Sequence, residues 1–261
     1  MPPFYAVFSY RSLLQNYLKL KAEDLVLTRI PIKETNYSLI FDLQVKGVLS
    51  FPSFLSQILS SSKVAQAIVL KNFMPRYTYV ITNQINLLEV MQNPPPYEKY
   101  ITKKDKANCG LGIYLWNSLE DIFKFAGTSV LEFPFVLQPF YKDWKDIRVI
   151  LLGERYQEAY IRENKGNFRQ NLFFGGKAYS YILNAEELNF CKAIMDRGTF
   201  PYAHIDLAYV EGRGPFLSEI NLKGGIKGAK ISIELYEEII KSMEKEYFNL
   251  WQRDHQPFEI L

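Results

Sequence analysis

The stretch from His204 to Asn221, HIDLAYVEGRGPFLSEIN, constrains the fold more than any other part of the chain. Two β-like apolar runs flank a Gly-Arg-Gly turn, which predicts an antiparallel hairpin. Each run carries one carboxylate, Asp206 in the first and Glu219 in the second, and Asn221 follows two residues later. Polar groups in otherwise apolar strands cost free energy when they are buried, so they point to a role other than folding.

The hairpin register places these oxygen atoms together. If Gly212 and Arg213 form a two-residue turn, Asp206 lies directly opposite Glu219, with Cβ atoms ~4.5–5.5 Å apart. Asn221 shares the face of Glu219 because side chains alternate along a strand. Facing carboxylates repel unless a cation lies between them or one is protonated, and oxygen ligands suit Mg²⁺ or Mn²⁺. The alternative is a surface hairpin with a hydrated polar face, and a longer turn would shift the register.

Composition narrows the class of protein. The 261 residues favour one large domain or two modest ones, and 48% hydrophobic and 15% aromatic residues predict a sizeable core with ring-lined clefts. A net charge of +3 is too weak to indicate a nucleic-acid partner. Two cysteines cannot form a disulfide framework, and we find no secretory signal or membrane-length apolar run, so we expect a cytoplasmic protein without a membrane partner. Two histidines argue against a multi-histidine metal site or a histidine-based hydrolase triad.

The first part of the chain predicts a small α/β unit with parallel strands, followed by helices. A helical pattern covers residues 11–21, and the proline-rich stretch 92–100 predicts a surface loop. Strand-like runs occupy residues 4–10, 24–32, 37–43, 46–53 and 76–83, and helical stretches occupy residues 53–61 and 61–74.

The second part of the chain changes to antiparallel hairpins. Residues 99–116 predict a strand, a glycine-containing loop and a second strand, and residues 146–163 predict a hairpin around Gly153. We expect a helix at 117–127 with Asn117 or Ser118 as its cap, and an amphipathic helix at 231–251. We also expect a helix at 184–198, opened by an Asn184–Glu187 capping box and closed by Gly198.

Residues 146–178, DIRVILLGERYQEAYIRENKGNFRQNLFFGGKA, and the hairpin together resemble the ATP-grasp family. The resemblance is to its branch of ribosomal-protein glutamate ligases, lysine-biosynthesis ligases and glutathione synthetases. It covers most of Lys99–Lys230 and, more loosely, residues 46–74. It implies an ATP-grasp fold of the α/β (α+β) class. A short N-terminal pre-ATP-grasp α/β domain would occupy residues 1–62, with α+β subdomains at 63–134 and 135–261 that sandwich ATP.

The resemblance also implies the metal ligands. In the family an Asp, a Glu and an Asn bind two Mg²⁺ ions together with ATP, and these correspond to Asp206, Glu219 and Asn221; Mn²⁺ is an alternative. The family lysine that binds the phosphates corresponds to Lys103 in YITKKDKANCGLGI, at the start of a covering loop that contains Gly110 and Gly112. We favour Lys103 over its neighbours Lys104 and Lys106. The alternative is a solvated basic loop.

Adenine would lie near the segment VLQPFYKDWKDIR. The resemblance implies that Gln138, Pro139 and Phe140 line the adenine slot and that Asp146 lies near it. Relatives commonly carry an acidic residue where Pro139 stands, and a proline cannot donate a backbone N–H at that position.

The resemblance assigns the chemistry to a cluster of arginines. Arg169 would bridge the γ-phosphate and the reaction intermediate with Asn171 nearby, Arg162 would hold phosphate or the acceptor carboxylate, and Arg148 would contact ATP. Preplaced guanidinium groups stabilise a transferring phosphoryl group and a tetrahedral oxyanion without reorganisation. The alternative is a set of exposed surface arginines.

The loop LKGGIKGAK after the hairpin is expected to bind substrate through Gly224, Gly225 and Lys227. Lys227 stands where glutamate ligases tend to have Glu, and lysines in a flexible backbone suit an acidic substrate. The alternative is a loop with solvated lysines.

The predicted function is therefore an ATP-dependent ligase. Its partners would be ATP, a carboxylate substrate and an amine such as an amino acid, joined through an acyl phosphate. Two alternatives remain open, an ATP-grasp kinase and a nucleotide-binding module without turnover. A nucleic-acid binder is disfavoured because the lysines do not form an extended face with interleaved aromatics. Homo-oligomer formation and the identity of the acid and the amine stay open.

Overall fold

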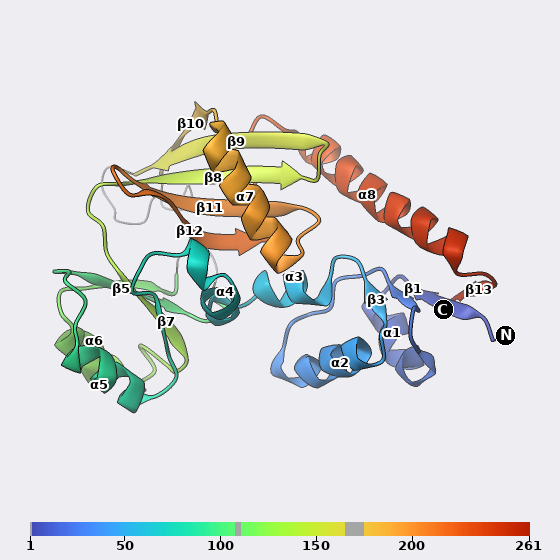
Figure 1. Cartoon of the computed structure of the whole chain (residues 1–261), viewed down its shortest axis with the longest axis horizontal. Coiled ribbons are helices and arrows are strands. Elements are labelled where there is room, and N and C mark those ends of the chain that lie inside the picture. Colours follow the sequence, from blue (N-terminus) through green and yellow to red (C-terminus); the bar gives the residue numbers. More distant parts are fainter. Residues whose placement is uncertain (1, 108–110, 165–174) are drawn as a thin grey trace.

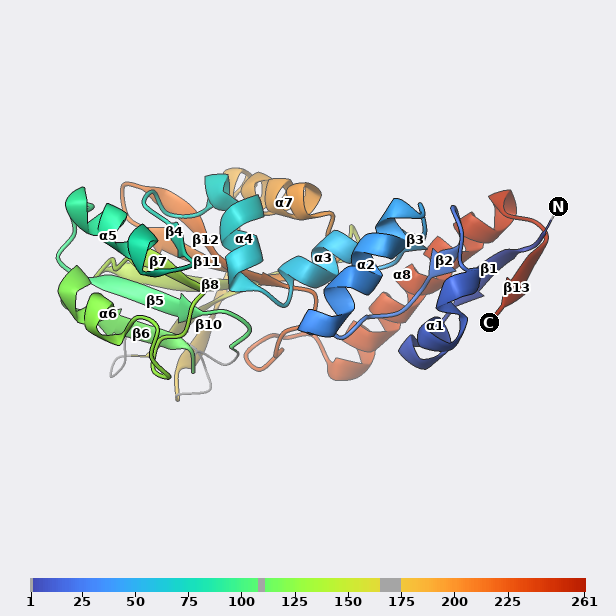
Figure 2. The same cartoon turned by 90° about the horizontal axis from the view of Figure 1, so that it is seen from below.

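The structure is a computed structural model that describes residues 2–107, 111–164 and 175–261 (Figure 1). The described residues form three sheets, one parallel and two antiparallel. Figure 2 shows the parallel sheet at one end of the long axis and the two antiparallel sheets at the other, with helix α3 (Phe54–Leu59) between them. No helix in the described ranges is both long and apolar enough to cross a membrane.

The N-terminal unit is built on a parallel sheet of strand order β13-β1-β2-β3, which confirms the predicted parallel arrangement. Its strands are β1 (Phe4–Val7), β2 (Leu25–Val26), β3 (Leu49–Ser50) and β13 (Phe258–Ile260). Its helices are α1 (Tyr10–Asn16), the 3-10 turn η1 (Tyr17–Lys19) and α2 (Glu34–Val45).

The strand predicted at residues 37–43 is wrong, because this segment lies inside helix α2. The residues that α2 buries are Asn36, Ile40 and Leu43, spaced four and three apart as one face of a helix requires. Phe41 and Val45 are 58% and 87% exposed. The run is apolar on several sides, so its pattern does not separate a helix from a strand.

Strand β13 was not predicted, and it comes from the far end of the chain. It pairs in parallel with β1, and Trp251 near the end of α8 (Ile233–Asp254) packs against Ala6 and Leu25. The N-terminal sheet therefore draws on residues beyond the segment 1–62 assigned to it. The boundaries at residues 62 and 134 stay predictions.

The second sheet has the antiparallel order β4-β7-β5-β6. Helices α5 and α6 contribute the buried side chains of Leu87 and Ile122 to the core of this sheet. Ser118 is the cap of α6, since its Oγ accepts from the backbone N of Asp121 at 3.1 Å. The elements are α4 (Lys63–Val69), η2 (Lys71–Phe73), β4 (Tyr79–Ile81), α5 (Gln84–Gln92), β5 (Tyr100–Lys104), β6 (Ile113–Trp116), α6 (Leu119–Phe125) and β7 (Phe135–Pro139).

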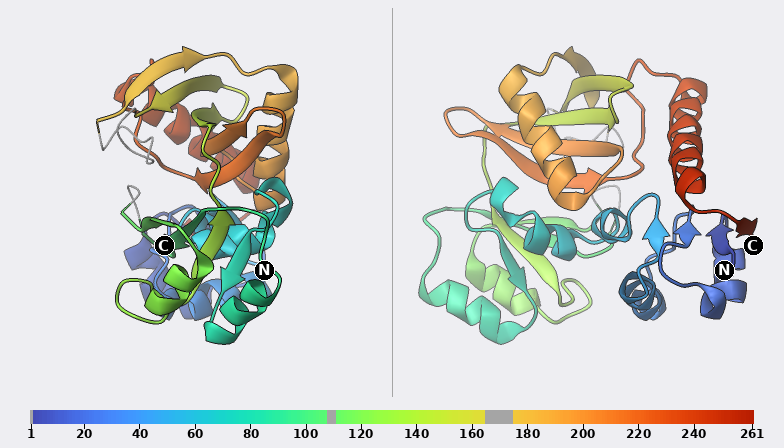
Figure 3. Two further views of the ribbon diagram at one scale, coloured as in Figure 1. Left: turned by 90° about the vertical axis from the view of Figure 1, so that its left-hand side faces the viewer. Right: turned by 45° about the vertical axis from the view of Figure 1, so that its right-hand side comes forward.

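The third sheet has the antiparallel order β10-β9-β8-β11-β12 and lies above the second in Figure 3 (left). Its strands are β8 (Trp144–Leu152), β9 (Tyr156–Glu163), β10 (Lys177–Tyr181), β11 (Ala203–Val210) and β12 (Gly214–Asn221). Helix α7 (Ala185–Gly198) packs Cys191 and Ile194 into the core formed with this sheet. Because side chains alternate along a strand, the opposite face of β8 and β11 is free to carry polar groups.

The β11–β12 turn is one residue longer than predicted, because Val210 pairs with Gly214 and leaves three residues in the turn. This longer turn alone would have separated Asp206 from Glu219. A β-bulge at Ser218 removes the offset, since Leu207 pairs with Leu217 and Asp206 pairs with Glu219. The predicted opposition is confirmed, although the turn that led to it is wrong.

Helix α7 carries the predicted capping box. The Asn184 side chain accepts from the backbone N of Glu187 at 2.9 Å, and the Glu187 carboxylate accepts from the backbone N of Asn184 at 2.9 Å. The helix ends at residue 198 as expected, but the left-handed cap is Thr199, at φ 52°, rather than the predicted Gly198. Gly198 lies inside the last turn, where a Cβ would approach the Phe200 ring to 2.6 Å.

Replacing Asn184 by Ala should lower the free energy of unfolding by ~1 kcal/mol, because the Glu187 amide loses its acceptor. Urea unfolding followed by circular dichroism measures the difference. Asn184→Ser keeps a capping oxygen and should stay close to wild type. Equal losses for both variants would contradict a role of the cap itself.

Candidate active site

A cavity of about 870 Å³ lies between the second and third sheets, a size typical of small-molecule sites. It brings together the predicted site residues that the structure describes, except Gly112 of the predicted covering loop, which does not line it. The second sheet and the segment after it contribute Lys103, Gln138, Pro139 and Phe140, the third sheet contributes Asp146, Arg148, Arg162, Asp206, Glu219 and Asn221, and the loop after β12 contributes Gly224, Gly225 and Lys227. The predicted residues Gly110, Arg169 and Asn171 lie outside the described residues.

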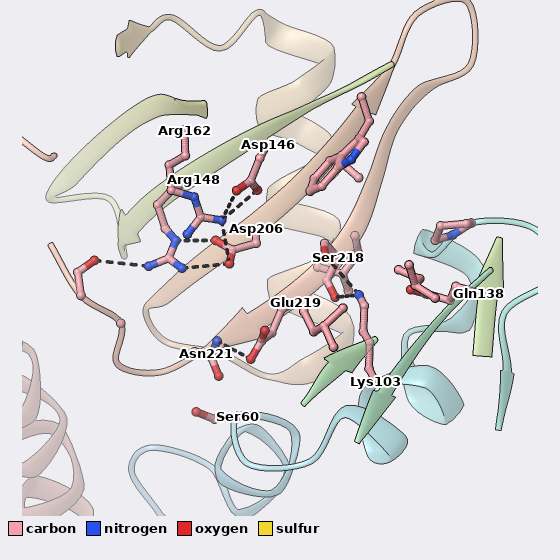
Figure 4. A pocket seen from close by; sticks show the side chains of 18 of the residues that line it. Ser60, Lys103, Gln138, Asp146, Arg148, Arg162, Asp206, Ser218, Glu219 and Asn221 are labelled. Atoms are coloured by element: carbon pink, nitrogen blue, oxygen red, sulfur yellow. Dashed lines mark hydrogen bonds and ion pairs between the residues drawn. The ribbon is translucent and has the colours of Figure 1, made fainter. Parts of the chain in front are cut away.

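A buried network of charges forms the floor of the cavity (Figure 4). Strand pairing sets Asp206 opposite Arg148 and sets Asp146 opposite Arg162. Asp206 accepts from Nε of Arg148 at Oδ1 and from Nη2 of Arg148 at Oδ2, the latter at 2.8 Å, and it lies 3.0 Å from Nη2 of Arg162. Arg162 also lies 2.7 Å from Asp146. The two arginines are therefore not exposed surface residues, because each is held by carboxylates of a neighbouring strand.

The network fixes the charge of its members. Burial by itself would raise the pKa of Asp206, but Arg148 and Arg162 outweigh burial and hold that pKa below its ordinary value. Burial raises the pKa of Asp146. The nearby Arg162 lowers this pKa, and the Asp206 carboxylate raises it further. Burial would lower the pKa of Arg162, and the two carboxylates raise it instead. The two guanidinium groups in the floor therefore stay positively charged while largely buried. Electrostatic interactions are stronger in such a low-dielectric environment than in water.

Glu219 is bound by a residue that the sequence analysis missed. Nζ of Lys63, at the start of α4, lies 3.2 Å from Oε1 of Glu219 and donates to the carbonyl O of Ala107 at 2.6 Å. The signal for Lys63 was its place at the beginning of the mostly apolar helical stretch 61–74, which carries only one other charged residue, Lys71. This ammonium links the metal-ligand candidate to the segment that leads into the predicted phosphate-covering loop.

The oxygen atoms of Asp206, Glu219 and Asn221 fit a hard cation in their chemistry. Asn221 donates through Nδ2 to Oε1 of Glu219 at 3.2 Å, which leaves its carbonyl oxygen for a ligand. The described residues contain no group of three or more His, Cys, Asp and Glu side chains that could hold a metal. The set is two carboxylates and an amide, and its metal-binding role stays a prediction.

Lys103 is the buried member of the predicted lysine trio. It is 5% exposed, and its Nζ donates to the backbone O of Ser218 at 2.9 Å and to Oγ of Ser218 at 3.2 Å. The β-bulge at Ser218 therefore also supplies the anchor for this ammonium. Burial lowers the pKa of Lys103 to about 8, against a raising effect of Glu219. Lys106 lies exposed at the rim of the cavity.

Gly224 allows the substrate loop to lie against the network. A Cβ at this position would be 2.8 Å from Nδ1 of His204 and 3.0 Å from Nη1 of Arg148. Arg148 also donates through Nη1 to the carbonyl O of Gly225 at 3.2 Å, so one guanidinium contacts both Asp206 and the loop. His204 is buried beneath this loop, with Nε2 2.9 Å from Tyr236 Oη, and burial lowers its pKa to about 4.

The rim carries exposed cations that no described carboxylate pairs with. Lys223 and Lys227 come from the loop after β12, and Arg29 comes from the N-terminal unit. Arg29 was not predicted as a site residue, because nothing local in residues 24–32 marks it as near the hairpin.

Comparisons with known proteins agree with this geometry. A family described as the RimK-like ATP-grasp domain matches residues 57–243. A curated protein named probable alpha-L-glutamate ligase, from Picosynechococcus sp., is 32% identical over 103 residues. These residues are 38% of the chain and 34% of the relative, so the match spans about a third of the relative's length.

Two solved structures show the same fold. D-alanine–D-alanine ligase from Bacillus anthracis, complexed with ATP, superposes with a TM-score of 0.61 at 13% identity, covering 94% of this chain and 85% of that one. A RiPP-associated ATP-grasp ligase from Chryseobacterium gregarium, in complex with ADP and a leader and core peptide, gives 0.57 at 15% identity, covering 86% and 78%. At these identities the likeness shows the ATP-grasp fold.

The lowered pKa of Lys103 predicts a pH-dependent stability. Between pH 8 and the ordinary pKa of 10.5 the unfolded chain binds a proton that the folded chain has lost, so this group makes the free energy of unfolding rise with pH. In Lys103→Met the titrating ammonium is absent, so the free energy of unfolding should lack this contribution to its rise with pH. Urea unfolding at several pH values from 7.5 to 10 should show the stability of wild type relative to the variant increasing with pH. A constant difference would contradict a buried, destabilised ammonium.

Proposed function

Because the chain belongs to the RimK-like ATP-grasp family, we propose that it is an ATP-dependent ligase that joins a carboxylate to an amine. In this reaction the substrate carboxylate takes the γ-phosphoryl group of ATP and ADP leaves. The amine then attacks the acyl phosphate, and inorganic phosphate leaves as the amide forms. The observation that carries the proposal is the single cavity in which Lys103, the Arg148–Asp206–Arg162 network and the glycine loop face one another.

The phosphates would lie against the fixed cations of the floor. Lys103 would hold the α- and β-phosphates, since its ammonium is buried and already aimed by Ser218. Arg148 and Arg162 would stabilise negative charge on the transferring group and on the acceptor, with little reorganisation because carboxylates of the third sheet already orient them. Arg169 and Asn171 keep the catalytic roles that the resemblance implies.

Asp206, Glu219 and Asn221 would hold two Mg²⁺ ions, or Mn²⁺ in their place. Such ions supply charge that neutralises the phosphate oxygens during transfer. Without the ions, the negative charges of Asp206 and Glu219 are compensated by ion pairs with Lys63, Arg148 and Arg162. When a divalent cation binds, these side chains would share the carboxylate oxygens with it.

The acceptor end would take an acidic substrate, with an amino acid as the amine. Gly224 and Gly225 allow close approach of the substrate, and Lys227 stands on the same loop. Arg29 and Lys223 add positive charge at this rim. Arg148 contacts both Asp206 and the Gly225 carbonyl, and these contacts would hold the substrate loop at a fixed position relative to the phosphates.

The decisive experiment measures ADP release with pools of carboxylates and each amino acid, followed by mass spectrometry of the product. A ligase needs the amine and yields ADP, phosphate and an amide. A kinase yields a stable phosphorylated product without any amine, and that result would replace the proposal.

Replacing Glu219 by Gln should lower turnover by on the order of 100-fold or more, because a metal ligand loses its charge while the side chain keeps its shape. Steady-state kinetics with magnesium measures the effect. Glu211→Gln, an exposed change in the turn of the same hairpin, should leave turnover unchanged. Normal magnesium-dependent turnover in Glu219→Gln would remove Glu219 from the metal site.

A further inference from the structure

The backbone next to Gln138 offers few hydrogen-bond donors to a bound base. Pro139 has no N–H, and the N–H of Phe140 donates to the carbonyl O of Lys99 at 2.9 Å. Both residues line the cavity, yet neither can donate a backbone hydrogen bond into it. Any hydrogen bond donated to a base at this end must therefore come from elsewhere than these two backbone positions.

Gln138 is the buried polar side chain at this end. It is 3% exposed and lines the cavity, and the pairing of Ile101 with Gln138 and of Lys103 with Val136 sets it on the same face of the sheet as Lys103. In the view of Figure 4 it lies at the side away from Arg148. Its Nε2 donates to Oγ1 of Thr78 at 3.0 Å, and no described residue donates to its Oε1.

Thr78 fixes which way this amide faces. Oγ1 of Thr78 lies 2.7 Å from the carbonyl O of Pro75, and two oxygens this close need a hydrogen between them. The hydroxyl has only one hydrogen, so towards Gln138 it offers a lone pair alone. The amide nitrogen must face Thr78, and Oε1 must face the cavity as an acceptor. Thr78 is itself 3% exposed, so water does not replace it.

We propose that Gln138 Oε1 accepts a hydrogen bond from the exocyclic amine of a 6-aminopurine, and that Thr78 is the positioning residue that makes this selection. The inference rests on the proposed function, in that the cavity must hold a nucleotide. A 6-oxopurine presents an oxygen at the same place, and two acceptors then face each other in a buried setting. Such a mismatch is penalised more strongly than a missing contact at a solvated site.

The first test compares nucleotides on the wild-type protein. Calorimetric titration with ADP and with IDP, each with Mg²⁺, requires no knowledge of the acid or the amine. ADP should bind about 10- to 100-fold more tightly than IDP. Equal affinities would overturn the inference while leaving the proposed function intact. Absence of any ADP binding would overturn both.

The second test separates positioning from packing at Thr78. Thr78→Val removes the hydroxyl at similar volume, so the amide can turn and the ADP-to-IDP preference should fall to about 3-fold or less, with IDP gaining affinity. Thr78→Ser keeps the hydroxyl and should keep the wild-type preference. A wild-type preference in a folded Thr78→Val would show that Thr78 does not set it.

Gln138→Leu gives an independent measurement, which also decides the matter if Thr78→Val does not fold. The acceptor is then absent, so the preference for ADP over IDP should again fall to about 3-fold or less. A purely structural role of Gln138 would weaken both nucleotides equally and leave the ratio at its wild-type value. That result would overturn the inference.

Discussion

The ion pairs that join Asp206 to Arg148 and Arg162 are the interaction on which the rest of the site depends. They connect three neighbouring strands through buried charges, and removing one partner would leave an uncompensated charge, which is far more costly than never burying the pair. Arg148 also reaches the glycine loop, and both guanidinium groups line the cavity. The same guanidinium and carboxylate groups therefore stabilise the fold and form the proposed site. This explains why the third sheet carries charged residues on one face and a continuous apolar core on the other.

Local pattern predicted the elements that local forces determine. The capping box of α7, the antiparallel hairpins and the carboxylate pair at Asp206 and Glu219 follow from residue types at short spacing. The hairpin also shows how such a prediction can be right for an incomplete reason. The turn is one residue longer than the glycine pattern indicates, and the bulge at Ser218 restores the pairing. A bulge leaves no mark in hydrophobic periodicity, because it changes only one residue on one strand.

Features that depend on distant parts of the chain could not be predicted. Lys63 reaches Glu219 across 156 positions, and strand β13 joins β1 from the other end of the sequence. Helix α2 was mistaken for a strand because Phe41 and Val45 expose apolar surface that the rule of buried faces does not expect. In each case the missing information is tertiary contact, which overrides local preference. The family resemblance supplied the site residues, and the strand pairing supplied their neighbours.

The return of the chain through α8 to β13 has a mechanical consequence. The N-terminal unit is joined to the two antiparallel sheets at two places, through residues 51–53 and through α8, rather than through one linker. Both connections are anchored in the core beside the third sheet, where Phe51 packs against Tyr202 and against Tyr247 of α8. Arg29 belongs to this unit, so the two connections together set where its charge lies at the cavity rim.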